Sequence, residues 1–189
     1  YLCATPIGNL EDMTYRVVRT LQEVDLIAAE DTRNSIKLLN HFEIKTPMTS
    51  YHEYNKIEKA YVLIEKMREG QNIALITDAG MPAISDPGEH LVKICYENGI
   101  VIESVPGPTA FATAIAISGL YTGRFAFEGF LSTNKTNRFA HLEEIKNHHE
   151  TLIFYEAPHK LKPTLADMMT SFAGDRRISL CREITKLNE

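Results

Sequence analysis

The chain has 189 residues, a net charge of −5 and 44% apolar residues, a composition typical of a globular protein. This length allows one large domain or two smaller ones with cores of their own. No apolar run approaches the length of a membrane span, so we expect no membrane partner. The negative charge does not by itself indicate a nucleic-acid binder, although a local basic face is enough for one.

Three cysteines, Cys3, Cys95 and Cys181, are far apart in the sequence and form no Cys-x-x-Cys pair. This scattered, odd count favours a reducing compartment and predicts a cytoplasmic protein whose thiols pack as small core groups. We expect no metal site, because the adjacent His148 and His149 would point to different sides of a helix. Both ends of the sequence lie at or close to predicted strands, so we expect the chain to be part of a longer one.

Short apolar runs alternate with helix-like segments over the first 118 residues. The predicted strands cover residues 1–5, 26–29, 46–51, 73–77 and 101–105, and the predicted helices cover residues 14–21, 35–42, 57–67, 88–98 and 110–118. Asp86 and Pro87 predict the start of the fourth helix, as N-cap and first helical residue, and Gly99 predicts its end. This alternation indicates an α/β domain over residues 1–120, with a parallel five-stranded sheet covered by helices on both faces.

The pattern changes after residue 120, which predicts a second α/β domain over residues 121–189 with a mixed sheet and an incomplete C-terminus. Its predicted strands cover residues 125–130, 151–155 and 177–182. A polar loop at residues 132–138, with Lys135 and Arg138, precedes a helix that ends near residue 148, and a second helix covers residues 158–172.

The unusual residues follow the carboxyl ends of the first five strands, which gather at one edge of a parallel sheet, where such sheets bind ligands. They are Thr5-Pro6-Ile7-Gly8-Asn9, Glu30-Asp31-Thr32-Arg33, Tyr51-His52-Glu53, residues 78–88 and Pro106-Gly107-Pro108-Thr109. A Gly-x-Gly-x-x-Gly segment and a P-loop are both absent from the sequence. The Gly- and Pro-rich loops instead suggest a ligand held by backbone groups, such as an adenosine, with Met81 and Ile84 nearby.

Two carboxylates and a guanidinium follow the second strand. Glu30-Asp31-Thr32-Arg33 fits either a capped helix start with a surface ion pair or a polar acceptor site. In the second case Arg33 would bind a phosphate, and Glu30 or Asp31 would deprotonate a hydroxyl.

Other positions also have a structural alternative. His52 is either a hydrogen-bonding surface residue or a catalytic one, and residues 154–158 either pack or form part of a site. Lys135 and Arg138 are solvated unless RNA is the substrate, in which case they contact phosphates.

Seven segments together resemble the bacterial ribosomal RNA small-subunit methyltransferase I family, in matching order and nearly from end to end. The segments are residues 5–12, Ala29-Glu30-Asp31-Thr32-Arg33, Ser50-Tyr51-His52-Glu53, residues 78–88, residues 105–110, Glu128-Gly129-Phe130-Leu131 and residues 154–159. The resemblance implies a two-domain tetrapyrrole-methylase-like fold, S-adenosyl-L-methionine as cofactor, and a homodimer. It also implies methylation of the ribose 2′-hydroxyl of a cytidine in the decoding region of 16S rRNA, within the small ribosomal subunit.

The resemblance and the loop chemistry together predict three groups of site residues. Catalytic residues are Glu30, Asp31 and Arg33, with either carboxylate as the base. Cofactor-binding residues are Pro6, Asp78, Ala79, Gly80, Ile84, Ser85, Pro106, Gly107, Pro108, Thr109, Phe154, Tyr155 and Ala157. Substrate-binding residues are Asn9, His52, Glu53, Lys135 and Arg138.

Two rival functions stay open. One is a tetrapyrrole C-methyltransferase acting on a porphyrinogen or precorrin, whose relatives usually carry Gly-Asp-Pro where this chain has Asp78-Ala79-Gly80-Met81-Pro82. The other is a ribosome-assembly factor that binds RNA without catalysis.

Overall fold

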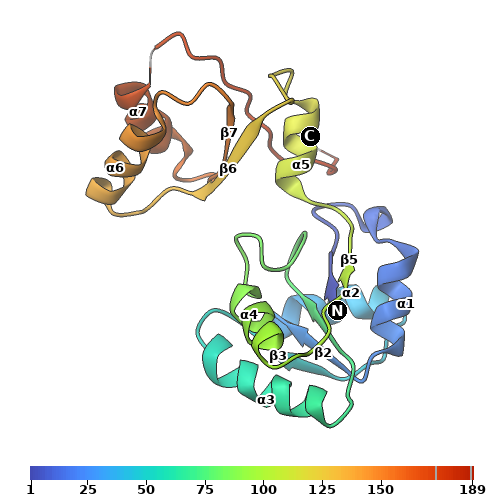
Figure 1. The fold of residues 1–189 in the computed structure, drawn as a ribbon. Helices are drawn as coiled ribbons and strands as arrows, with labels where there is room; N and C mark the ends of the chain where they lie inside the picture. Colours follow the sequence, from blue (N-terminus) through green and yellow to red (C-terminus); the bar gives the residue numbers. More distant parts are fainter. Residues whose placement is uncertain (173, 188) are drawn as a thin grey trace. The chain divides into compact units, whose positions relative to one another are not determined.

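The computed structural model describes residues 1–172, 174–187 and 189 (Figure 1). These residues form two compact units, one made of Tyr1–Ala110 and Glu183–Glu189 and the other of Phe111–Arg182. The boundary at residue 120 between two domains with separate roles, predicted from the sequence, stays a prediction. In the described part of the chain, no helix has both the length and the apolar character needed to cross a bilayer.

A five-stranded parallel sheet forms the centre of the first unit. Its strands, in spatial order, are β3 (Met48–Ser50), β2 (Leu26–Ala29), β4 (Ile73–Ile76), β1 (Leu2–Cys3) and β5 (Ser104–Val105). Every pairing is parallel, which confirms the predicted sheet and places all five carboxyl ends at one edge.

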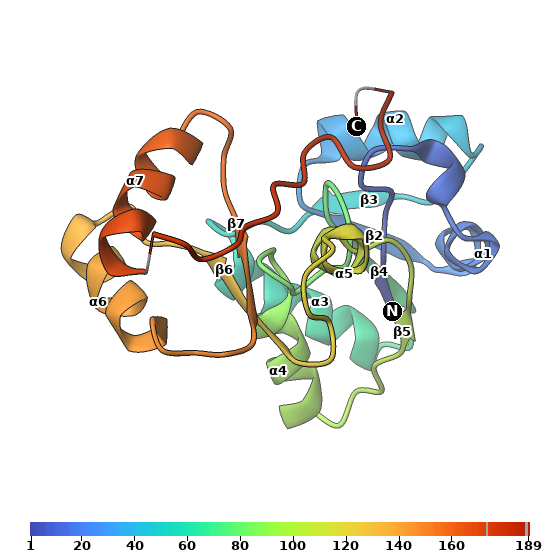
Figure 2. The same ribbon diagram turned by 90° about the horizontal axis from the view of Figure 1, so that it is seen from above.

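Helices cover both faces of this sheet (Figure 2). They are α1 (Tyr15–Glu23), α2 (Thr32–His41), α3 (Lys56–Arg68) and α4 (Glu89–Glu97), with a short 3₁₀ turn, η1 (Leu10–Asp12), before α1. One apolar cluster joins Val17 of α1 and Leu39 of α2 to Ile76 of β4. A second cluster joins α3 and α4 to Leu75, whose side chain points to the opposite face because residues alternate along a strand.

The start of α4 differs from the prediction. Gly88, not Asp86, occupies the N-cap position, and its φ of +146° lies outside the helical region. Pro87 therefore precedes the helix instead of opening it, and Asp86 belongs to the loop. The predicted end is confirmed: Gly99 follows the helix with a φ of +66°, the left-handed conformation that glycine adopts without strain.

The second unit contains α5 (Ala110–Ile117), which begins at the last residue of the first unit, then β6 (Phe125–Phe130), α6 (Lys135–Ile145), β7 (Thr151–Tyr155) and α7 (Leu161–Ser171). Strands β6 and β7 lie where they were predicted, and they pair in parallel with a register shift between Phe127 and Gly129.

Three predictions for this unit were wrong. Within the described residues the sheet is a parallel pair and not a mixed sheet. Residues 177–182 form no strand, because no neighbouring strand covers them: Ile178 and Leu180 are 67% and 63% exposed. Lys135 and Arg138 lie on α6, not in a loop, because the Asn134 side chain accepts a hydrogen bond from the Asn137 backbone N–H and starts the helix earlier.

Candidate functional site

The loops after β1 and β4 are joined at the carboxyl edge of the first unit's sheet. Thr5 and Gly80 exchange two backbone hydrogen bonds of 2.9 Å each, and the Thr5 hydroxyl donates to the Thr77 carbonyl oxygen at 3.0 Å. Gly80 has a φ of +84°, and a Cβ added there would meet Ile7 at 3.5 Å and the carbonyl oxygen of Pro108 at 3.8 Å. The loops after β1, β4 and β5 therefore meet around Gly80.

The loop of residues 78–88 has a strained backbone at two non-glycine positions. Ala83 and Ser85 have φ values of +68° and +59°, a region that costs a non-glycine residue roughly 1–3 kcal/mol when the surroundings impose it. A Cβ on Gly88 would lie 3.0 Å from both Ala83 and Leu75, so the loop is packed closely at its base. Backbone strain held in place by packing is typical of ligand clamps and active sites.

The loop after β5 packs against β1. A Cβ on Gly107 would lie 3.0 Å from the Ala4 side chain, so a larger residue there would require Ala4 to shift. Pro6 and residues 78–80 and 106–109 therefore lie at one edge, as the sequence predicted from the parallel sheet. Their role in cofactor binding stays a prediction.

Asp31 and Arg33 form an ion pair at the start of α2. Asp31 is the N-cap, accepts the Arg33 backbone N–H at 2.9 Å, and binds the Arg33 guanidinium through Nε at 3.0 Å and Nη2 at 2.7 Å. These bonds to Arg33 hold the pKa of Asp31 at about 2. The Arg33 side chain is 88% exposed. The first alternative for this segment is therefore confirmed: it is a capped helix start with a surface ion pair.

Three other carboxylates, those of Glu30, Asp78 and Asp86, belong to the segments that follow β2 and β4. The Asp78 backbone N–H donates to Glu30 Oε2 at 3.3 Å, and Asn34 donates to the Asp78 carboxylate at 3.0 Å. Burial raises the pKa of Glu30, an effect that the Asp78 N–H partly offsets. Burial, aided by the negative charge of Glu30, raises the pKa of Asp86 to about 6. Glu30 therefore holds a proton more readily than Asp31 does.

Three predicted substrate residues, Asn9, His52 and Glu53, lie in the first unit. Asn9 accepts the Glu11 backbone N–H at 3.0 Å and so caps η1. Glu53 pairs with Lys56 at 2.5 Å. His52 follows β3, and Nδ1 of its ring is buried without a hydrogen-bond partner among the described residues. The ring is near enough to Glu30 to influence the pKa of that carboxyl group.

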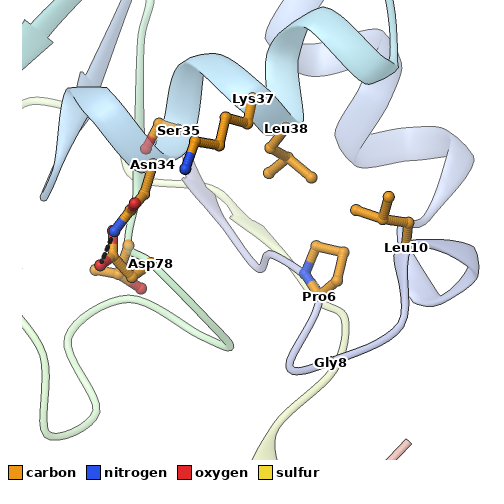
Figure 3. Close-up of a pocket in the computed structure, with 9 residues that line it drawn as sticks. Pro6, Gly8, Leu10, Asn34, Ser35, Lys37, Leu38 and Asp78 are labelled. Carbon is orange, nitrogen blue, oxygen red and sulfur yellow. Dashed lines mark hydrogen bonds between the residues drawn. The ribbon is translucent and has the colours of Figure 1, made fainter. Parts of the chain in front are cut away.

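A cavity of about 290 Å³ opens between the loop after β1 and helix α2 (Figure 3). Pro6, Gly8 and Leu10 line it from the loop. The other lining residues belong to α2 and to the end of β4: Asn34, Ser35, Lys37, Leu38, Thr77 and Asp78. All of them lie in the first unit.

The remaining predicted site residues lie in the second unit. Phe154 and Tyr155 end β7, and Ala157 follows; the Tyr155 hydroxyl accepts the Phe111 backbone N–H at 3.1 Å. Lys135 is exposed at the start of α6. The cofactor and substrate roles predicted for these residues stay predictions.

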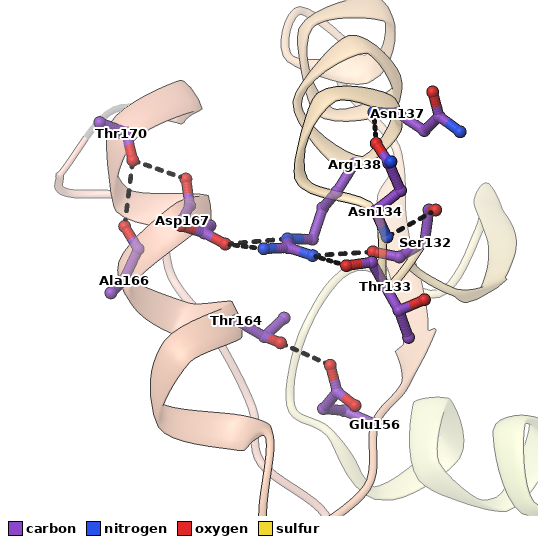
Figure 4. A network of polar contacts seen from close by, with 10 residues as sticks. All are labelled: Ser132, Thr133, Asn134, Asn137, Arg138, Glu156, Thr164, Ala166, Asp167 and Thr170. Carbon is purple, nitrogen blue, oxygen red and sulfur yellow. Dashed lines mark hydrogen bonds and ion pairs between the residues drawn. The ribbon is translucent and has the colours of Figure 1, made fainter.

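Arg138 is held by polar contacts within the second unit (Figure 4). Its Nε and Nη2 contact Asp167 at 2.8 and 2.6 Å, and its Nη1 donates to the carbonyl oxygens of Ser132 and Thr133. A phosphate contact by Arg138, the predicted role, would compete with these bonds.

Sequence reasoning missed two parts of the site. Asp86 was assigned to a helix cap, and the influence of the Glu30 charge on its pKa is a tertiary effect that no local pattern signals. The α2 face made by Asn34, Lys37 and Leu38 was also missed, although its spacing of three and four residues places these side chains on one side of a helix. Among the described residues no group of three or more His, Cys, Asp or Glu is placed to hold a metal ion.

Comparison with known proteins identifies the family of this chain. The family described as Tetrapyrrole (Corrin/Porphyrin) Methylases matches residues 1–189. The chain is 55% identical over 189 residues to "Ribosomal RNA small subunit methyltransferase I" of Halalkalibacterium halodurans and 52% identical to that of Synechocystis sp.. It covers 65% and 68% of those two proteins, and each match includes 100% of this chain. The protein of the same name from Thermotoga maritima is 45% identical over 188 residues, which is 84% of its length.

Solved structures show the same fold at low sequence identity. Cobalt precorrin-4 methyltransferase superposes with a TM-score of 0.64 at 19% identity, covering 87% of this chain and 72% of that one. Uroporphyrin-III-C-methyltransferase from Thermus thermophilus gives 0.60 at 18% identity, covering 89% and 71%. The chain therefore belongs to the tetrapyrrole methylase family and, within it, to the ribosomal RNA small-subunit methyltransferase I group.

Proposed function

We propose that this chain is part of an S-adenosyl-L-methionine-dependent methyltransferase that modifies small-subunit ribosomal RNA. The finer form of the proposal is methylation of a cytidine ribose 2′-hydroxyl in the decoding region of 16S rRNA, by a cytoplasmic homodimer. The relatives' printed names support the substrate class. The structural observation that carries the proposal is the hydrogen bond between the Glu30 carboxylate and the Asp78 backbone N–H, at the start of the strained loop of residues 78–88.

The edge of the sheet fits a cofactor held through its nucleoside. Gly80 and Gly107 lack side chains where two loops approach closely, and the left-handed Ala83 and Ser85 fix the shape of the loop in advance. The residues that would hold the cofactor in this unit are residues 79–85 and residues 106–109. Pro6 and Asp78, grouped with them from the sequence, also line the cavity beside α2. When bound, S-adenosyl-L-methionine supplies a methyl group made electrophilic by the adjoining sulfonium.

The protein's own residues then align the acceptor hydroxyl and take its proton. Alignment of two reactants can account for about 7–11 kcal/mol of a reaction barrier. Glu30 is the base that fits best, because burial raises its pKa, whereas the bonds between Asp31 and Arg33 make Asp31 a weak base. Arg33 uses Nε and Nη2 for Asp31, and its exposed outer edge would bind an RNA phosphate.

The test is transfer of a labelled methyl group from S-adenosyl-L-methionine to three acceptors. These are small ribosomal subunits from a strain lacking the corresponding modification, free rRNA, and a porphyrinogen. We expect label in the RNA, located by nuclease digestion and mass spectrometry on a ribose oxygen. Label in the porphyrinogen alone would support the tetrapyrrole alternative. RNA binding with no heat on titration of the cofactor would support the assembly-factor alternative.

A further inference from the structure

The cavity between the loop after β1 and α2 has an apolar side and a polar side (Figure 3). Pro6 and Leu10 of the loop and Leu38 of α2 contribute hydrocarbon. Asn34 and Asp78 contribute a hydrogen-bonded pair, with the amide donating to the carboxylate at 3.0 Å. A flat ring with a polar rim suits such a cavity, because its faces pack on hydrocarbon and its rim meets the hydrogen-bonding groups.

The size of the cavity restricts the ligand. Its volume of about 290 Å³ is at the lower end of ligand pockets, which run from roughly 300 to 1,000 Å³. One nucleobase with its ribose fits a space of this size. Enzymes that do chemistry on a nucleobase extrude it from the stack into a close-fitting pocket, and an enzyme that modifies the ribose could read the attached base in the same way.

We propose that this cavity receives the nucleobase of the acceptor nucleotide and that Asn34 and Asp78 select a base with an exocyclic amino group. This inference rests on the proposed function, since it assumes an RNA acceptor. A carboxylate only accepts hydrogen bonds, so Asp78 pairs with an amino group such as N4 of cytosine. The O4 of a uracil at the same place would face the carboxylate with no proton between them.

The cavity is adjacent to the base proposed for the reaction. The Asp78 backbone N–H donates to Glu30 at 3.3 Å, so the residue that meets the nucleobase is also bonded to the carboxylate that takes the ribose proton. Lys37 is exposed on the same helix as Asn34 and supplies positive charge for the phosphate of the same nucleotide. Base, ribose and phosphate would each meet a different side chain.

The test compares small subunits reconstituted with rRNA that carries cytidine or uridine at the mapped methylation site. We expect the wild-type protein to favour cytidine about tenfold or more in kcat/KM, and Asp78→Asn to reduce that preference to within about threefold. Asn34→Ala should lower the rate on cytidine roughly 5- to 100-fold. The matched control is Asn40→Ala, an exposed asparagine of α2 outside the cavity, which should change neither rate nor preference.

Three outcomes overturn the inference, and each is distinct from failure of the proposed function. The wild-type protein could methylate a uridine or use both substrates equally. Asp78→Asn could leave the preference unchanged while thermal unfolding shows a folded protein. Asp78→Asn could lose affinity for S-adenosyl-L-methionine by calorimetry and keep the base preference, which would assign Asp78 to the cofactor. If the wild-type protein transfers no methyl group to any rRNA, the proposed function itself fails.

Discussion

The strands of the two units differ in how deeply they are buried. All four residues of β4 in the first unit are buried, and Ile76 is completely shielded from solvent. No residue of β6 or β7 in the second unit is fully buried, and Phe125 and Phe130 are 46% and 58% exposed. Parallel sheets are stable when helices cover both faces. The first unit meets that condition with its own residues, and the described β6–β7 pair does not.

Hydrogen bonds and ion pairs between side chains join the elements of the second unit. Arg138 joins α6 to Asp167 of α7, Thr164 of α7 donates to Glu156 after β7, and His141 contacts Glu128 of β6 at 2.9 Å. In the first unit, apolar packing fixes the sheet, and the sheet in turn fixes the loops at its edge. Reactive groups need positions held by packed, rigid elements, so the difference favours the first unit as the location of the chemistry.

The largest expected effect comes from removing the proposed base in the first unit. Glu30→Gln keeps the shape of the side chain and should lower kcat for methyl transfer by roughly 100- to 10,000-fold. Asp31→Asn should lower it much less, because Asp31 caps α2 and binds Arg33. Single-turnover methyl transfer with saturating cofactor measures both variants. A severe loss in Asp31→Asn with normal turnover in Glu30→Gln would reverse the assignment.

The second unit provides the control for that experiment. Lys135 is exposed on α6, and its proposed task is contact with an RNA phosphate. Lys135→Ala should raise KM for the ribosomal substrate a few-fold, in the range of about 1 kcal/mol that exposed charges contribute, and leave kcat unchanged. A loss of kcat comparable to that of Glu30→Gln would show that the chemistry is not confined to the first unit.

The next prediction compares the stability of the two units directly. Ile76→Ala in β4 should lower the free energy of unfolding of the first unit by about 2–5 kcal/mol, because it leaves a cavity in a closed core. Ile153→Ala in the half-buried β7 should cost less than half as much. Hydrogen exchange measures each unit separately in one protein. Equal costs would mean that β7 is covered as well as β4 in solution.

Local sequence patterns predicted the strands and loops whose form depends on residues that are neighbours in the chain. The apolar run at residues 73–77 predicted β4, and the Gly and Pro residues after it predicted the loop at the edge of the sheet. The strand predicted at residues 177–182 failed because apolar alternation specifies a face but does not provide a neighbour to pair with. Lys135 was placed in a loop because α6 buries only Leu142 and Ile145, too few apolar residues to make a clear helical period.

The candidate site shows the same limit. The parallel topology correctly predicted that Glu30 and the loop of residues 78–88 would lie at one edge. It did not predict that Asp86 would lie within electrostatic reach of Glu30, because the position of Asp86 depends on the left-handed turns at Ala83 and Ser85, which residues of this type rarely adopt. Strained positions of this kind are set by the surrounding packing and not by the preference of the residue itself.

A smaller effect tests the polar bonds of the second unit. Arg138→Met keeps the length of the side chain but leaves Asp167 without its partner, and should lower the stability of this unit by about 1.5–3 kcal/mol. The control is Arg177→Met, at an exposed arginine. Hydrogen exchange in α6 and α7 measures the change. If hydrogen exchange is unchanged and RNA binding becomes weaker and less dependent on salt, Arg138 contacts an RNA phosphate, as predicted from the sequence.

The smallest expected effect is a pH dependence in the first unit. Burial raises the pKa of Asp86 to about 6 from an ordinary value of 3.8, so the folded protein binds this proton more tightly than the unfolded chain. The resulting stability is fully present below pH 4 or so and is lost as the pH rises through about 6. Asp86→Asn resembles the protonated form and should stabilise the first unit at pH 7.5 by about 1 kcal/mol, a figure reduced for solvent screening because Asp86 is only partly buried.

Denaturation at pH 7.5 and pH 4.5 measures this effect, with Asp175→Asn as the exposed control in the second unit. The gain at pH 7.5 should be nearly absent at pH 4.5, and an equal gain at both values would show that ionisation of Asp86 is not its cause. A carboxylate that lowers stability at neutral pH is typical of a functional site. Asp86→Asn should therefore stabilise the unit and still lower methyl transfer, whereas the packed residues of β4 lose stability and activity together when they are truncated.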